Sequence, residues 1–129
     1  MKHKKEFLLI EGTIYPFDIL VTTASDEAVF KYIEKKKRYK LVDEEKQAMR
    51  FGEQTMGKTI RLLGGPTIIR MKKQKTITGI DIADLAHEIE HAVFMIFDRI
   101  GMKHTIESDE AYAYFQQYIM RKVLQFWQK

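Results

Sequence analysis

His87, Glu88 and His91 are residues whose types and spacing could catalyse a reaction, because together they form the pattern HExxH. On a helix, two histidines four positions apart project from the same face one turn apart, so both imidazoles can bind one metal ion. Glu88 stands beside them and can hold a water molecule that is bound to this ion. The pattern therefore predicts a zinc site that activates water.

A catalytic zinc ion needs a third protein ligand and leaves its fourth position to water. Glu110 is the main candidate, because it follows His91 after 18 intervening residues and falls in the first turn of the next expected helix. Glu107 lies one turn earlier and is the alternative, and His104 also remains possible. Asp109 would point to a different side of that helix. We therefore expect a site of two histidines and one carboxylate.

Two helices in the C-terminal half must position these residues. A long helix is expected from Asp81, with Gly101 at the position where a glycine commonly ends a helix. A polar connection follows, and Ser108 is the expected N-cap of a last helix that runs to about Trp127. The apolar stripe of the long helix consists of Ile82, Leu85, Ala86, Ile89, Val93, Ile96, Phe97 and Ile100.

The first half of the chain contains four short apolar runs that are typical of strands. Residues 7–12 and 17–22 are joined by a Thr-Ile-Tyr-Pro connection, and residues 58–63 and 67–71 flank Gly64-Gly65-Pro66. Each pair predicts a hairpin. Between the pairs, a helix is expected over residues 25–37 with Ser25 as its N-cap, and a shorter one from Asp43 to before Gly52.

These elements predict an α+β fold in one domain over residues 1–129. We expect a small, twisted antiparallel sheet packed on the two C-terminal helices, with the helix of residues 25–37 on the same core. The sequence contains no repeat, linker or low-complexity segment that would indicate a domain boundary.

Composition narrows the possible chemistry. The chain has no cysteine, so disulfides, a thiol nucleophile and cysteine-based metal sites are excluded, and a cytoplasmic location fits best. No apolar run approaches the roughly 18 residues of a membrane span. The basic start over residues 1–5 leads only into a short apolar stretch, which argues against a signal peptide.

The net charge of +4 comes mostly from three basic runs at residues 2–5, 35–40 and 70–75. A nucleic-acid interface would gather such charge on one face and interleave aromatic side chains for stacking. Tyr39 is the only aromatic residue inside a run. The runs therefore favour solvated surface over a nucleic-acid interface.

With HExxH on one helix and a glutamate on the next, residues 58–118 resemble the gluzincin branch of zinc metallopeptidases. The segment Glu110-Ala111-Tyr112-Ala113 resembles the glutamate helix of small gluzincins, including the ImmA/IrrE-type peptidases. Residues 15–19 and 108–114 are similar to short HExxH proteins of bacteriophages and prophages. The resemblance implies a minimal zincin-like fold, a Zn²⁺ ion and a peptide or protein substrate in the host cytoplasm.

Two departures from related families matter. Many gluzincins carry an aspartate four residues after the ligand glutamate, where this chain has Tyr114, and Asp98 is a possible replacement. Phe94 and Phe97 stand at the glycine and third histidine positions of the metzincin pattern, which excludes a metzincin site with three histidine ligands.

The expected mechanism is metal-assisted hydrolysis of a peptide bond. His87, His91 and Glu110 hold zinc, Glu88 acts as general base, and Tyr114, one turn beyond Glu110, could donate to an oxyanion. The resemblance to zincins implies that the strand before the metal helix, residues 67–72, is an edge that pairs with substrate. The alternative is a non-catalytic, zinc-stabilised binding or regulatory protein with a protein or nucleic-acid partner.

Overall fold

The structure is a computed structural model that describes residues 6–12 and 15–128. The basic run at residues 2–5 lies outside the described residues. So do residues 13–14, which belong to the connection of the first predicted hairpin. The elements follow in the order β1 (Phe7–Ile10), β2 (Ile19–Thr22), α1 (Asp26–Lys36), α2 (Asp43–Met49), β3 (Gly57–Arg61), β4 (Thr67–Met71), α3 (Gly79–Arg99) and α4 (Asp109–Trp127).

The strands form a mixed sheet in the order β1-β2-β4-β3, so the α+β class is confirmed. Both predicted hairpins are present as antiparallel pairs, but β2 and β4 run parallel, so the expectation of a wholly antiparallel sheet is wrong. The parallel pairing arises because α1, α2 and β3 lie between β2 and β4 in the chain, which gives room for a crossover connection.

The parallel pairing also decides which strand lies at the edge. β4 lies between β2 and β3, and all its residues are buried. The prediction that residues 67–72 form the edge strand beside the metal helix is therefore wrong, and β3 takes that place.

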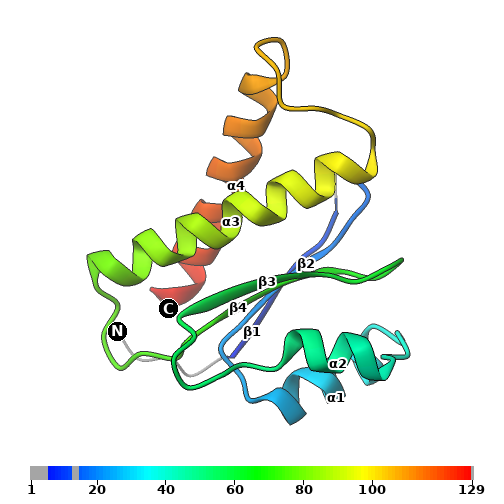
Figure 1. Ribbon diagram of the computed structural model, residues 1–129. Coiled ribbons are helices and arrows are strands. Elements are labelled where there is room, and N and C mark those ends of the chain that lie inside the picture. The colour runs from blue at the N-terminus through cyan, green and yellow to red at the C-terminus, as the bar shows by residue number, and fades with distance from the viewer. Residues whose placement is uncertain (1–5, 13–14, 129) are drawn as a thin grey trace.

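Helices cover both faces of the sheet (Figure 1). Ile69 and Met71 of β4 pack with α3 and α4, whereas Ile68 packs with α1 on the opposite face. Alternate side chains of a strand point to opposite faces, so the one central strand contributes to two cores. The prediction that the helix of residues 25–37 shares a core with the C-terminal helices is therefore wrong.

The helix ends follow the sequence closely, with one exception. Ser25 caps α1 by accepting a hydrogen bond from the Ala28 N–H at 3.3 Å, and Gly101 has a φ of +76° directly after α3. Thr78 and Asp81 form a capping box, which starts α3 earlier than expected. Ser108 is the N-cap of α4, as predicted, but its side chain makes no capping hydrogen bond, and its Oγ accepts from the Thr105 N–H at 2.8 Å instead.

The apolar stripe of α3 is buried along most of its length, from Leu85 to Phe97. Ile82 and Ile100, which were predicted at its ends, are exposed. None of the helices in the described part of the chain combines the length and the apolarity that a membrane crossing requires.

Candidate metal and catalytic site

The two histidines of the HExxH pattern converge on one point outside α3. Their Nε2 atoms lie 3.2 Å apart, the planes of their rings make an angle of 79°, and both residues are exposed. Two nitrogens bound to one tetrahedral zinc ion at 2.0–2.1 Å are about 3.3 Å apart. The pair therefore fits one edge of a zinc tetrahedron, and the same separation lets one neutral ring donate a hydrogen bond to the other.

Glu88 points in a different direction from the histidines, toward the sheet. Its exposed fraction is 8%, and the Thr59 Oγ1 on β3 donates a hydrogen bond to its Oε1 at 2.7 Å. The same hydroxyl lies 3.0 Å from the backbone carbonyl of Glu88. Glu88 is therefore held between α3 and the edge strand β3.

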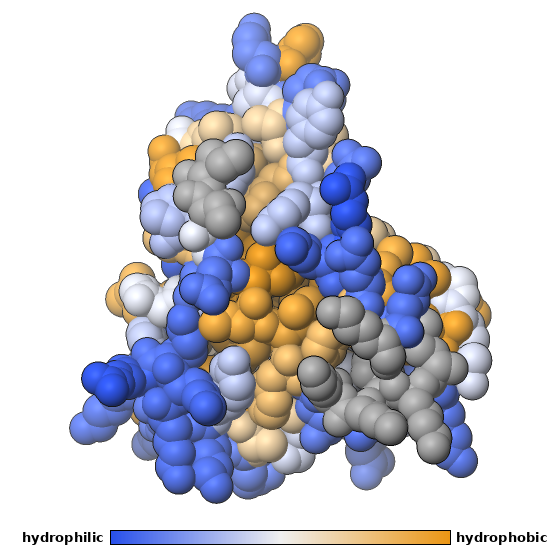
Figure 2. Space-filling model, turned by 180° about the vertical axis from the view of Figure 1, so that it is seen from behind, coloured by the Kyte–Doolittle hydropathy of each residue, from blue (hydrophilic) through white to orange (hydrophobic). Residues whose placement is uncertain are grey.

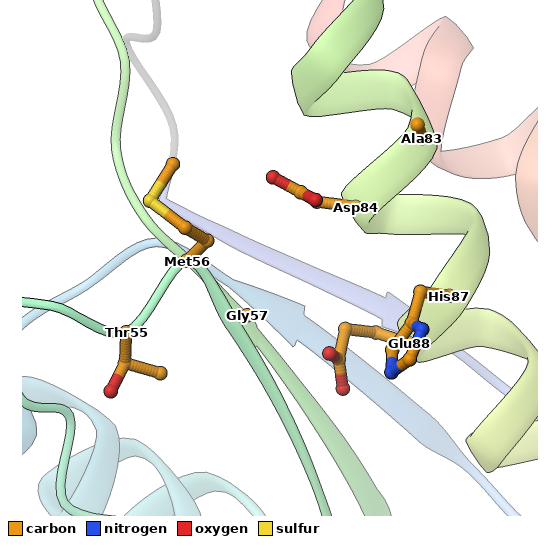
Figure 3. Close-up of a pocket in the computed structure, with 7 residues that line it drawn as sticks. All are labelled: Thr55, Met56, Gly57, Ala83, Asp84, His87 and Glu88. Carbon is orange, nitrogen blue, oxygen red and sulfur yellow. The ribbon is translucent and has the colours of Figure 1, made fainter.

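An open pocket of about 460 Å³ is lined by His87 and Glu88. Asp84, His87 and Glu88 extend into it from α3, and residues 55–57 form its other wall (Figure 3). His87 of the pair and the carboxylate of Glu88 thus line the same open pocket.

Alternate residues of β3 contact α3. Gly57 and Thr59 lie against Glu88, and Arg61 pairs with Asp98 at 2.8 Å. Ile60 faces the opposite core. Asp98 therefore contacts Arg61, and the structure shows no contact between Asp98 and the histidine pair.

Glu110 and Tyr114 are not brought to the histidine pair. Tyr112 of α4 is buried, its ring lies 4.5 Å from that of Phe97, and its hydroxyl donates to the carbonyl of Met102 at 2.8 Å. Residues two positions apart on an α-helix point about 200° away from each other. Glu110 and Tyr114 each lie two positions from Tyr112, so they lie on the opposite face of α4, where both are exposed.

The other candidate ligands also lie elsewhere. Glu107 is exposed in the connection, and His104 pairs with Asp109 at 2.8 Å while its ring stacks on Tyr112 at 4.2 Å. Burial raises the pKa of Tyr112, and the carboxylates of Asp98 and Glu90 raise it further.

In the part of the chain that the structure describes, no three His, Cys, Asp or Glu side chains form a group that could hold a metal ion. The structure thus assembles two of the three predicted ligands.

Sequence reasoning missed Thr59, Gly57 and Asp84 as residues of this site. Asp84 shares the face of the histidines, because it lies one turn before His87 on α3, and this spacing could have indicated it. Thr59 and Gly57 gave no such signal, because their relation to Glu88 depends on how β3 packs against α3.

The two described basic runs lie at opposite ends of the sheet. Lys37 pairs with Asp18, just before the first residue of β2. Lys73 pairs with Glu6 near the other end of β2, because the next residue, Phe7, lies opposite Thr22, the last residue of β2. Burial acts to raise the pKa of Asp18, but the hydrogen bonds from Lys37 and from the Gly12 N–H outweigh it, so the net pKa lies below 3.8. These runs do not form one continuous basic face.

Comparisons with protein-family models, with curated proteins and with solved structures find no significant match. The site combines an exposed histidine pair, a buried glutamate and an edge strand, and His87, Glu88 and Gly57 line one pocket.

Proposed function

We propose that this protein is a zinc-dependent metallopeptidase. The observation that carries the proposal is the 3.2 Å separation of the His87 and His91 Nε2 atoms on the α-helix that also carries Glu88. Two converging histidines without an acid would serve a purely structural metal, whereas hydrolysis also needs a general base beside the ion.

His87 and His91 would hold the ion through their Nε2 atoms. When bound, zinc would lower the pKa of a water molecule to about 7 and polarise the carbonyl group of a substrate. Glu88 would take the proton of that water and then give it to the leaving amine. Its place in the pocket that His87 also lines supports this role.

Glu110 is the third ligand that the gluzincin resemblance implies, and its role depends on a rearrangement of the first turn of α4. Ser108 makes no capping hydrogen bond to this turn, and residues 103–107 before it are exposed. An uncapped first turn leaves backbone N–H groups without side-chain partners, but the contact of His104 with Asp109 would have to break or move with this turn. Tyr114 lies one turn later on the same exposed face, so its proposed role as an oxyanion donor depends on the same rearrangement.

A peptide is the substrate class that the surroundings favour. The outer edge of β3 has no strand partner within the described residues, and the pocket lies between this strand and α3. An extended peptide can pair with such an edge through its backbone, which would bring a peptide bond past the histidines.

Zinc titration of histidine variants tests the proposal. We expect His87→Ala and His91→Ala to lose zinc binding and peptidase activity, because each removes one of two converging ligands. His104→Ala is the matched control and should retain both, because His104 contacts Asp109 and Tyr112 instead. A wild-type protein that binds zinc but cleaves no unfolded protein or peptide library would favour the non-catalytic, zinc-stabilised alternative.

A further inference from the structure

We infer that Thr59 is a positioning residue for Glu88, which it reaches from the edge strand across the interface between β3 and α3. This inference rests on the proposed function, because it assigns Glu88 as the general base. It adds a residue that lies 29 positions away from Glu88 in the chain and outside the HExxH pattern.

The contact has the geometry of a strong hydrogen bond. The Thr59 Oγ1 lies 2.7 Å from Oε1 of Glu88 and 3.0 Å from the carbonyl oxygen of the same residue. A hydroxyl has one proton to donate, and a bond to a carboxylate is about twice as strong as one to a neutral acceptor. The proton of Thr59 therefore belongs mainly to the carboxylate.

Burial makes this single donor important. Glu88 is about nine-tenths buried, and a buried carboxylate that lacks hydrogen bonds is costly. Within residues 6–12 and 15–128, the one hydrogen bond that the Glu88 side chain receives comes from Thr59, and no cation forms an ion pair with Glu88. Loss of the Thr59 hydroxyl would therefore remove the hydrogen bond that orients the Glu88 carboxylate.

Gly57 confines the carboxylate on a second side. A Cβ atom built on Gly57 would lie 2.8 Å from Cγ and 3.2 Å from Oε2 of Glu88, and 3.0 Å from the sulfur of Met71. Such approaches are closer than side chains tolerate, so the absent side chain makes the space that Glu88 occupies. Strand β3 thus fixes Glu88 by one hydrogen bond and by one contact surface.

This arrangement gives the two carboxylate oxygens different roles. Oε1 is bound to Thr59, so we expect Oε2 to be the oxygen that accepts a proton from water in the pocket that Glu88 lines. Figure 3 shows the Glu88 side chain reaching from α3 toward the strand segment at Gly57, with the imidazole of His87 at the preceding position of the same helix. Thr59 therefore determines which oxygen acts as the base and where it lies.

Thr59→Val and Thr59→Ser separate the hydroxyl from the shape of the side chain. Valine keeps the volume and the branching but has no donor, and serine keeps the donor. In zinc-loaded protein we expect Thr59→Val to lower kcat about 10- to 100-fold with KM changed less than twofold, because misplacement of a reacting group affects the chemical step. Thr59→Ser should restore kcat to within about threefold of the wild-type value, and all three proteins should bind zinc equally, because neither histidine is changed.

A second measurement tests the contact without any activity. In metal-free protein, the free energies of urea unfolding of wild type, Thr59→Val, Glu88→Ala, which removes the acceptor, and the double variant form a double-mutant cycle. We expect the double variant to lose less than the sum of the two single losses, because the two residues share one hydrogen bond. Additive losses would overturn the contact itself.

The outcomes distinguish this inference from the proposed function. An active wild type with an unchanged kcat in Thr59→Val would overturn the positioning role and leave the peptidase proposal standing. Equal loss of kcat in Thr59→Ser and Thr59→Val would also overturn it, because the hydroxyl would then be irrelevant. A coupled cycle in a protein without any peptidase activity would overturn the proposed function, and the catalytic part of this inference with it.

Discussion

Adjacent residues of one helical turn have opposite exposure in this site. His87 and His91 face solvent, whereas Glu88 is buried against β3. An exposed histidine pair lets an ion enter from water with its ligands already together. A buried carboxylate is only partly hydrated and is fixed in direction, which favours proton transfer within the pocket. The proposed chemistry therefore uses two different environments on one turn of α3.

Glu88→Gln tests the role of the acid. Glutamine keeps the size of the side chain and can still accept the hydrogen bond from Thr59, but it cannot take a proton from water. We expect zinc content and melting temperature to stay close to the wild-type values while peptide cleavage falls about 10²- to 10⁴-fold. Metal analysis, thermal unfolding and a peptide-library assay measure the three quantities.

Glu90→Gln is the matched control for this variant, because Glu90 is exposed on the same helix. It removes the same charge two positions away and should leave cleavage unchanged. Equal activity of wild type and Glu88→Gln would show that Glu88 is not the general base.

The histidine pair could be predicted from the sequence because the spacing of i and i+4 on a helix is a local property. The Nε2 separation of 3.2 Å follows from that spacing and from the rotamers on one helical face. Glu110 is different, because its position depends on the path of residues 100–108 and on which face of α4 is apolar. Tyr112 and Ile119 form the buried face of α4, and this places Glu110 on the opposite side.

At the scale of elements, the first turn of α4 is the place where the sequence and the structure diverge most. A ligand in this turn would couple zinc binding to the conformation of α4. We expect Glu110→Ala to weaken zinc binding at least tenfold and Glu107→Ala to leave it within about twofold, because only Glu110 lies on the helix. Isothermal titration with Zn²⁺ measures both affinities.

Equal affinities in the two variants would instead place the third ligand elsewhere. Asp84 is then the next residue to change, because it lines the pocket together with His87.

The interface between β3 and α3 allows a test by adding one methyl group. Gly57→Ala places a Cβ atom 2.8 Å from Cγ of Glu88, so Glu88 or the strand must move. We expect a loss of about 1–3 kcal/mol in the free energy of unfolding, as for other overpacked sites, together with a lower kcat. Urea unfolding and steady-state kinetics measure the two effects.

Gly79→Ala is the control for Gly57→Ala. A Cβ atom on Gly79, in the first turn of α3, has no neighbour within 4 Å, and alanine favours helix. This variant should be slightly more stable than wild type and equally active. A destabilised Gly79→Ala would mean that glycine at this position has a role that the contacts do not explain.

At the scale of the whole molecule, the sheet separates two layers with different roles. α3 and α4 carry the proposed chemistry, and α1 and α2 cover the other face (Figure 1). Seen from the opposite side, apolar side chains gather near the centre of the surface and are surrounded by hydrophilic ones (Figure 2). The number and type of elements could be predicted from local patterns, but the strand order could not, because pairing between β2 and β4 joins residues almost 50 positions apart.

Arg70 joins the sheet to the layer of α1 and α2. Its exposed fraction is 3%, and it donates hydrogen bonds to Asp26 at the start of α1, to the Met49 carbonyl at 2.6 Å and to the Ala24 carbonyl at 2.7 Å. Asp26 also accepts from the Phe51 N–H at 3.1 Å. One buried guanidinium therefore fixes the start of α1 and the end of α2 on the sheet.

The charge of Asp26 makes this attachment dependent on pH. Burial acts to raise the pKa of Asp26, but the hydrogen bond and the charge of Arg70 outweigh it, with smaller contributions from Phe51 and Arg50, so the pKa lies below 3.8. A carboxylate with a lowered pKa in the folded protein stabilises it fully above the pKa of the unfolded chain. This contribution is lost as the pH falls below about 4 toward the pKa of the folded state.

Asp26→Asn should therefore reduce the free energy of unfolding by about 2–3 kcal/mol at pH 7, because a buried guanidinium loses its charged partner. The difference from wild type should be the same at pH 7 and pH 6 and should shrink below about pH 4, where the wild-type carboxylate becomes protonated. Urea unfolding of both proteins across this range gives the difference directly. Asp43→Asn, which changes an exposed aspartate in the first turn of α2, should show a much smaller difference. A difference between wild type and Asp26→Asn that stays constant down to pH 2 would show that the carboxylate charge does not attach α1 to the sheet.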